Sequence, residues 1–227
     1  MQLISVNVSL PREVQYKGKP VETGIFKEPV EGRRMLRTLN IDGDGQADLD
    51  NHGGPFRAAY CYTLENFNYW RERLQRDDIT YGRFGENFTV TGMPEDEVHI
   101  GDVFRIGGAL VQVTQPRPPC YKLGIRMGLP HLPKMFLASG RVGFYLRVLE
   151  EGEVGAGDPI ERIETHPERM SIREVIHLLY FDHENYEDAR RAADLEALTP
   201  RWRQIFAERA AKLEPVMNFE QVRGSST

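Results

Sequence analysis

The sequence predicts a mainly β protein with some α structure, in which a β-barrel is followed by a small three-helix domain. Up to residue 165, short alternating or β-branched segments are separated by Gly, Pro and Asp, and only two short helical patterns interrupt them. Such a pattern is typical of a closed or nearly closed barrel. Helical spacing then takes over. We therefore expect a barrel domain at residues 1–165, a three-helix domain at 166–215 and a loose tail at 216–227.

The barrel strands follow from alternation and β-branched content. We expect them at residues 3–8, 36–41, 57–63, 88–91, 98–104, 109–114, 142–149 and 159–163, with a short extended piece at 21–30. Gly107-Gly108 predicts a tight hairpin between two of these strands. The two helices are expected at 64–74, where Leu64, Phe67 and Leu74 share one face, and at 130–138, ending near Gly140.

Three helix starts define the C-terminal domain. Ser171-Ile-Arg-Glu174 reads as a capping box, Asn185 can cap a second helix, and Thr199-Pro200 has the order of a cap followed by a first-turn proline. At about 45 residues this unit is too small to fold robustly alone. We therefore expect it to pack on the barrel or on a partner.

Aromatic residues of the C-terminal helices have two interpretations. Tyr180-Phe181, Trp202 and Phe206 form either the domain's own core or an exposed apolar face. Such a face would dock an electron donor or form a homodimer. The sequence leaves both interpretations open.

Composition excludes several classes of function. The chain has 227 residues and a formal net charge of −5, so binding of a nucleic acid polymer is not expected. No apolar run approaches the length of a membrane span, and the N-terminal residues lack the pattern of a signal peptide. Cys61 and Cys120 are too few for a disulfide framework and lack the CxxC spacing of a structural zinc site. A cytoplasmic location follows as the expectation.

The segment Gln115-Pro-Arg-Pro-Pro-Cys-Tyr-Lys122 is the strongest candidate for chemistry. Its three prolines prevent a helix and stiffen the loop that follows a predicted strand. Arg117 and Lys122 flank Cys120, and positive charge next to a thiol favours the reactive thiolate form. The alternative is a small buried side chain, because cysteine is often found in protein cores.

A second candidate is the polar loop that contains His52-Gly-Gly54. Glycines there would let backbone N–H groups approach an anion, although a plain surface turn explains the same residues. Asn87, in Phe84-Gly-Glu-Asn87, is either a buried polar anchor or a turn former.

Together these segments resemble the MOSC domain family, the sulfurase C-terminal domain fold associated with the molybdenum cofactor. The resemblance rests on Thr23-Gly-Ile-Phe-Lys27, Asp44-Gly-Gln-Ala-Asp48 with His52-Gly-Gly54, Phe84-Gly-Glu-Asn87, Gln115–Lys122, and Arg141-Val-Gly-Phe-Tyr145. The three C-terminal helices match the YiiM-type branch, which carries a three-α domain. The resemblance covers nearly the whole chain, with its motifs in the expected order.

The resemblance implies a pterin-based molybdenum cofactor, with Cys120 as the protein ligand to molybdenum. Catalytic roles would fall to Cys120 and His52, the histidine as a proton donor. Pyridoxal phosphate is not expected. The residues that would bind the cofactor and its phosphate are Lys27, His52, Gly53, Gly54, Arg57, Asn87, Arg117, Cys120, Lys122 and Arg141.

The function implied by the resemblance is reduction of N-hydroxylated compounds, such as N-hydroxylated purine bases, to the amine and water. Electrons would come from a flavin and iron–sulfur donor, either a separate protein or further modules of a longer chain. Alternatives are a molybdenum-cofactor carrier without turnover, or a carrier of persulfide sulfur on Cys120. A Cys120–His52 hydrolase is a weaker alternative, because the sequence names no third orienting group. Phe56 stands where the family pattern predicts an acidic residue, which would alter the substrate entrance if that side chain shapes it.

Overall fold

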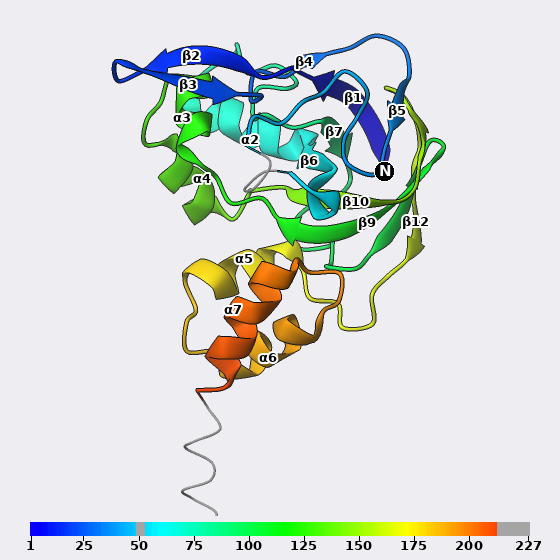
Figure 1. Cartoon of the computed structure of the whole chain (residues 1–227), viewed down its shortest axis with the longest axis vertical. Coiled ribbons are helices and arrows are strands. Elements are labelled where there is room, and N and C mark those ends of the chain that lie inside the picture. Colours follow the sequence, from blue (N-terminus) through cyan, green and yellow to red (C-terminus); the bar gives the residue numbers. More distant parts are fainter. Residues whose placement is uncertain (49–52, 213–227) are drawn as a thin grey trace, which may run out of the picture.

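A computed structural model describes residues 1–48 and 53–212, and a mixed eight-stranded sheet forms its centre (Figure 1). All neighbouring strands are antiparallel except β6 and β7, which run parallel. In spatial order the strands are β12 (Ile160–Glu164), β8 (Val103–Ile106), β9 (Ala109–Pro116), β10 (Phe144–Glu150), β6 (Ala59–Thr63), β7 (Phe88–Thr91), β1 (Gln2–Val8) and β4 (Glu28–Pro29). Two small ladders join β2 (Arg12–Tyr16) to β3 (Lys19–Thr23) and β5 (Arg34–Leu36) to β11 (Gly152–Val154).

The mainly β fold followed by a three-helix domain is confirmed, although the sheet is not closed into a barrel. In the described residues, β1 meets the start of β12 at an isolated bridge between Gln2 and Pro159. The amide of Leu3 donates to the carbonyl of Asp158 at 2.9 Å and the amide of Ile160 to the carbonyl of Met1 at 3.1 Å, but the two strands form no continuous ladder. The short β4 pairs with the end of β1 instead. The sheet is therefore strongly curved but open.

The sheet domain carries three α-helices in its described part, one more than the sequence predicts. These are α2 (Leu64–Leu74), α3 (Tyr121–Met127) and α4 (Leu132–Ser139), with a 3-10 turn η1 (Pro55–Arg57). The Thr63 side chain caps α2 by accepting the Asn66 amide. α3 was not expected. It begins directly after Cys120 and lies with α4 beside the β2–β3 hairpin (Figure 1), where the rings of Tyr16 and Tyr121 are 5.9 Å apart.

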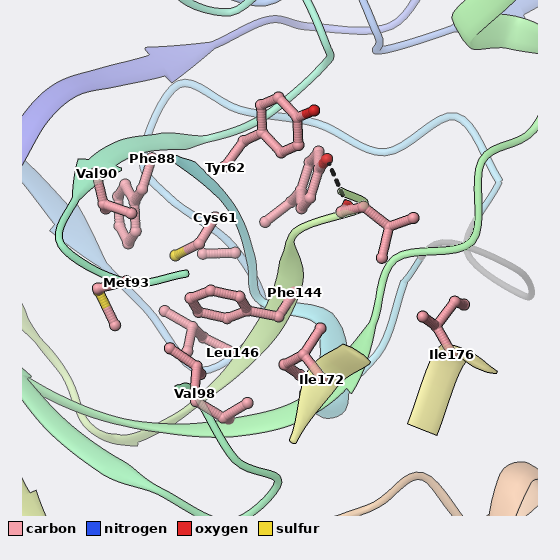
Figure 2. Close-up of a cluster of buried hydrophobic side chains, with 14 of the residues drawn as sticks. Cys61, Tyr62, Phe88, Val90, Met93, Val98, Phe144, Leu146, Ile172 and Ile176 are labelled. Carbon is pink, nitrogen blue, oxygen red and sulfur yellow. Dashed lines mark hydrogen bonds between the residues drawn. The ribbon is translucent and has the colours of Figure 1, made fainter. Parts of the chain in front are cut away.

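One apolar core runs from the sheet into the C-terminal helices. Figure 2 shows Cys61 of β6 pointing into this core, with Phe88 and Phe144 around it and Ile172 of the C-terminal domain nearby. Burial raises the pKa of the Cys61 thiol, which keeps it protonated. Cys61 is therefore a core side chain, and Cys120, which is partly exposed, is the cysteine available for chemistry.

The C-terminal domain contains α5 (Ile172–Tyr180), α6 (Tyr186–Asp194) and α7 (Pro200–Ala210). Two of the three predicted caps form hydrogen bonds, with a reciprocal box between Ser171 and Glu174 and an Asn185 side chain that accepts the Asp188 amide. Thr199 holds the N-cap position of α7 and Pro200 follows in the first turn, but the Thr199 side chain makes no capping hydrogen bond. This domain lies against the β9 side of the sheet domain (Figure 1).

Backbone hydrogen bonds attach α5 to the sheet domain. The Ile100 amide donates to Met170, and the Ile172 amide to Val98, both at 2.9 Å. Trp202 and Phe206 are buried, whereas Tyr180 and Phe181 remain exposed. The docking and dimer interpretations stay predictions, as do the domain boundaries at 165 and 215. None of the helices in the described part of the chain has the length and apolar content to cross a membrane.

Candidate functional site

Two adjoining cavities meet at Cys120. The first, of about 80 Å³, is lined by Thr23, Gly24, Ile25, Lys27, Asp44, Gly45, Gln46, Ala47, Asp48, Arg57, Tyr60, Gly85, Asn87, Arg117, Cys120, Lys122 and Tyr145. The second, of about 320 Å³, is lined by Asp48, Arg57, Gln115, Pro118, Pro119, Cys120, Tyr145 and Trp202. Asp48, Arg57, Cys120 and Tyr145 line both, so the cysteine lies where the two spaces adjoin.

The position of Cys120 follows from the local sequence. β9 ends at Pro116, and the two further prolines carry the chain to Cys120, which has an extended backbone and precedes α3 as its N-cap residue. The amide of Leu123 donates to the Cys120 carbonyl at 3.0 Å, which fixes the start of the helix. Cys120 is thus held between a strand end and a helix start. A stiff support of this kind suits a side chain that must present its sulfur in one direction.

Lys27 and Asp44 form a buried ion pair in the wall of the first cavity. Asp44 also accepts the Ser9 amide and the Asn87 side-chain amide, each at 2.9 Å. Burial lowers the pKa of Lys27, and the neighbouring Asp44 carboxylate opposes that effect. Asn87 additionally accepts the Tyr60 amide at 3.1 Å, so it is a buried polar anchor rather than a simple turn former. The positive charge of Lys27 in this wall is therefore accompanied by the negative charge of Asp44.

Arg117 is a buried cation with an unused donor. Its Nη1 has no hydrogen-bond partner in the described residues, and its guanidinium lies 5.1 Å from the centre of the Tyr60 ring. Burial acts to lower the pKa of Arg117, but Tyr60, Tyr145 and Cys120 together raise it, so the side chain stays charged. The Arg117 amide donates to the Gly143 carbonyl at 3.1 Å. Gly143 has a φ of +65°, and a Cβ there would lie 2.3 Å from the Cys61 carbonyl oxygen, so only glycine fits this support.

The remaining predicted site residues divide into three groups. Arg57 and Lys122 line the first cavity with Lys27 and Arg117, giving four basic side chains against two acidic ones. Gly53 and Gly54 line neither cavity, and Arg141 lies elsewhere, with its Nη1 donating to Asn66 at 2.8 Å and its guanidinium over the Tyr69 ring. His52 lies outside the described residues. Phe56 lines neither cavity.

Sequence reasoning missed the side chains that face Cys120 from distant elements. Tyr60 and Tyr145 lie on predicted strands, where aromatic residues look like ordinary core. Burial raises the pKa of Tyr145 and Arg117 opposes this, so the phenol stays protonated at neutral pH. Asp44 stood in a segment that carried the family resemblance, but nothing in the sequence shows that it pairs with Lys27. The residues described include no cluster of three or more His, Cys, Asp and Glu that could hold a metal.

A buried carboxyl lies directly behind the cavity wall. Glu86 accepts hydrogen bonds from the amides of Gly82 and Phe84, from the Thr89 hydroxyl and from the Asn7 side chain. Burial raises the pKa of Glu86 to about 7, although these donors oppose the rise. The folded protein therefore holds this proton more tightly than the unfolded chain, whose glutamates titrate near pH ~4.3.

We expect the free energy of unfolding to fall as pH rises from about 4.5 to about 7. In this range Glu86 loses its proton in the unfolded chain but keeps it in the folded protein. The shift corresponds to a change of about 3 kcal/mol in the free energy of unfolding. Urea unfolding at pH 5 and pH 7.5 should give a smaller pH dependence for Glu86→Gln than for the wild type. Glu65→Gln is the control, because Glu65 also accepts two hydrogen bonds but is exposed. Equal pH dependence in the wild type and Glu86→Gln would contradict the assignment.

Comparison with known proteins finds two family models that match this chain. The MOSC domain matches residues 48–161, and the YiiM-like, 3-alpha helix domain matches residues 170–213. The protein YflK of Bacillus subtilis (strain 168) is 41% identical over 94% of this chain and 96% of its own length. The crystal structure of YiiM from Geobacillus stearothermophilus has a TM-score of 0.77 and 35% identity, covering 92% of this chain and 98% of that one.

A more distant relative is named for an activity. A protein of Gibberella moniliformis (strain M3125 / FGSC 7600) named "Reductase" is 32% identical over 70% of this chain, which spans 28% of that protein's length. The two domain matches, the relative that aligns along nearly its whole length and the similar crystal structure agree with each other. The chain therefore belongs to the MOSC domain family, with a YiiM-like, 3-alpha helix domain after the MOSC domain.

Proposed function

We propose that this protein is a molybdenum-cofactor-dependent reductase of N-hydroxylated compounds, such as N-hydroxylated purine bases. The observation that carries the proposal is the position of Cys120 between a small cationic cavity and a larger second one. MOSC domains are associated with the molybdenum cofactor, and one relative is named a reductase. A cofactor and its substrate need adjoining spaces, and a reactive atom must lie where they meet.

The residues of the first cavity fit an anionic group. Arg117 is charged, buried and has a donor at Nη1 without a partner in the described part of the chain. A buried unsatisfied donor costs about 1–3 kcal/mol, and a phosphate oxygen would relieve that cost. Lys122 and Arg57 line the same space. The phosphate of the cofactor would therefore be held by Arg117, with Lys122 and Arg57 adding positive charge.

The chain's own residues have three further tasks. Cys120 would ligate the metal as a thiolate, a soft ligand that suits a metal already bound to sulfur. Tyr145, protonated and lining both cavities, would donate a hydrogen bond to the oxygen that leaves the substrate. The Lys27–Asp44–Asn87 network would keep the cavity wall in place. When bound, the molybdenum cofactor supplies oxygen-atom transfer, with electrons from a flavin and iron–sulfur donor.

The test is the molybdenum and pterin content of the full-length chain, purified from a host that loads another molybdenum enzyme. We expect close to one molybdenum per chain in the wild type and its loss in Cys120→Ala. Cys61→Ala, which removes the buried thiol instead, should retain the metal. Full molybdenum content in Cys120→Ala, or a metal-free wild type from the proven host, would overturn the assignment.

Turnover separates the reductase from the two carrier alternatives. With an artificial reductant, the loaded wild type should convert 6-hydroxylaminopurine to adenine, and Cys120→Ala should not. Stoichiometric cofactor without any reduction of N-hydroxylated compounds would favour a cofactor carrier. A cyanide-labile sulfur on Cys120 in place of molybdenum would favour the persulfide carrier.

A further inference from the structure

The C-terminal domain contributes a wall to the second cavity. Trp202, in the first turn of α7, lines that space together with Cys120 and Tyr145 of the sheet domain. Trp202 is 6% exposed, so most of its ring packs within the protein and a small part faces the cavity. The sequence suggested that Trp202 belongs either to the domain core or to a docking surface. Its position in the wall of a cavity that also contains Cys120 fits neither interpretation fully.

A residue that lines the same space carries a buried polar atom without a hydrogen-bond partner in the described residues. Gln115 lines the second cavity and is 2% exposed. Its Nε2 donates to the carbonyl of Pro116 at 3.4 Å, but its Oε1 has no hydrogen-bond partner in the part of the chain that the structure describes. Leaving a buried acceptor unpaired is energetically unfavourable. A ligand N–H or O–H group in the cavity would remove this cost.

The other lining residues combine rigid or aromatic faces with charged groups. Pro118, Pro119 and Tyr145 present rigid or aromatic faces, and the charged Arg57 and Asp48 also line the first cavity. A volume of about 320 Å³ lies at the small end of the usual range for ligand pockets, about 300–1,000 Å³. The space is therefore large enough for a small ring system that carries polar groups.

We infer that Trp202 and Gln115 form a base-recognition site, in which a heteroaromatic N-hydroxylated substrate contacts the indole ring and donates a hydrogen bond to Gln115 Oε1. The inference rests on the proposed reductase function and goes further. It makes the helical domain part of the substrate site, and it makes Trp202 a specificity-determining residue that favours aromatic over non-aromatic N-hydroxy compounds. Contact between an aromatic side chain and a base stabilises binding of the base.

Fluorescence tests the site without turnover, because Trp70 and Trp202 are the two tryptophans of the chain. The full-length protein is titrated with 6-hydroxylaminopurine in the absence of reductant. In Trp70→Phe, where Trp202 is the remaining emitter, we expect saturable quenching. In Trp202→Phe the quenching should disappear. No saturable quenching in Trp70→Phe, or quenching that survives in Trp202→Phe, would overturn the inference.

This readout does not depend on the metal. A metal-free protein that still shows Trp202 quenching would reject the proposed cofactor and retain the base site. A molybdenum-loaded, active enzyme without such quenching would retain the reductase and reject the base site.

Kinetics test specificity in the loaded enzyme, with 6-hydroxylaminopurine compared with N-hydroxyurea. We expect Trp202→Leu to raise KM for the purine about tenfold, which corresponds to about 1.4 kcal/mol, and to leave KM for N-hydroxyurea unchanged. Trp202→Phe should recover most of the loss. Gln115→Leu, which removes the acceptor at similar size, should raise KM for the purine about fivefold. Equal loss for both substrates, with unchanged molybdenum content, would reduce Trp202 to a structural role.

Discussion

Replacing Asp44 by alanine is expected to lower the free energy of unfolding by about 3–5 kcal/mol, because it leaves the buried ammonium of Lys27 without its partner. The Ser9 amide and the Asn87 side chain lose their acceptor in the same step. Urea unfolding at neutral pH measures the change. The deficit should shrink at alkaline pH, because an unpaired buried lysine titrates below its ordinary pKa and folding then favours the neutral amine.

Two variants make this result specific to the ion pair. Asp42→Ala removes the exposed partner of Arg37, a surface pair that contributes at most about 1 kcal/mol. Lys27→Met in the Asp44→Ala background removes the unpaired charge and should recover a large part of the lost stability. If Asp44→Ala were no more destabilising than Asp42→Ala, the buried pair would not be a significant source of stability.

Replacing Phe136 by alanine is expected to cost about 3–5 kcal/mol, the usual range for deleting a buried aromatic ring. Phe136 is fully buried in α4, with ring centres 5.4 Å from Tyr62, 5.6 Å from Trp70 and 5.7 Å from Phe84. Thermal or urea unfolding of the full-length chain measures the loss. The cavity left behind cannot collapse easily, because the three neighbouring rings are held by other contacts of their own.

The matched control is Phe181→Ala, which makes the same chemical change at a side chain that is 51% exposed. We expect that variant to lose less than about 1 kcal/mol. Similar losses in the two variants would mean that the ring cluster around Phe136 does not hold α4 as tightly as the distances suggest.

Local pattern was sufficient for the elements that are regular over their whole length. The predicted helix at 64–74 and the predicted strand at 88–91 have the observed bounds of α2 and β7. The predicted strand at 36–41 ends at Leu36, because the Arg37 amide bonds the Asn40 carbonyl in a tight turn. α3 was missed because the prolines before it and Gly124 within it weaken any helical signal, whereas burial of Leu123 and Met127 stabilises it.

The candidate site was also predictable only where its residues lie close together in the sequence. Cys120 and its cationic neighbours follow one another along the chain, so their proximity is visible in the sequence. The pairing of Lys27 with Asp44 is set by tertiary structure, as is the burial of Arg117 beneath Tyr60. The approach of Trp202 to Cys120 depends on how the helical domain docks, and no pattern within either segment specifies docking. Motifs identified the residues, but only the fold shows which charged side chains already pair with one another.

The bridge between Gln2 and Pro159 affects the order in which the chain can fold during synthesis. β1 is made before its partners, and the short β4 that follows at Glu28 covers only its end, whereas β7 begins at Phe88 and the contact with the start of β12 requires Pro159. At roughly 5–20 residues per second, the ribosome takes from several seconds to tens of seconds to supply β7 and the start of β12. During that interval the apolar side chains of β1 have no sheet to cover them. The N-terminal strand is thus among the last to be secured, and it is where a nascent chain of this protein is most exposed to misassembly or chaperone capture.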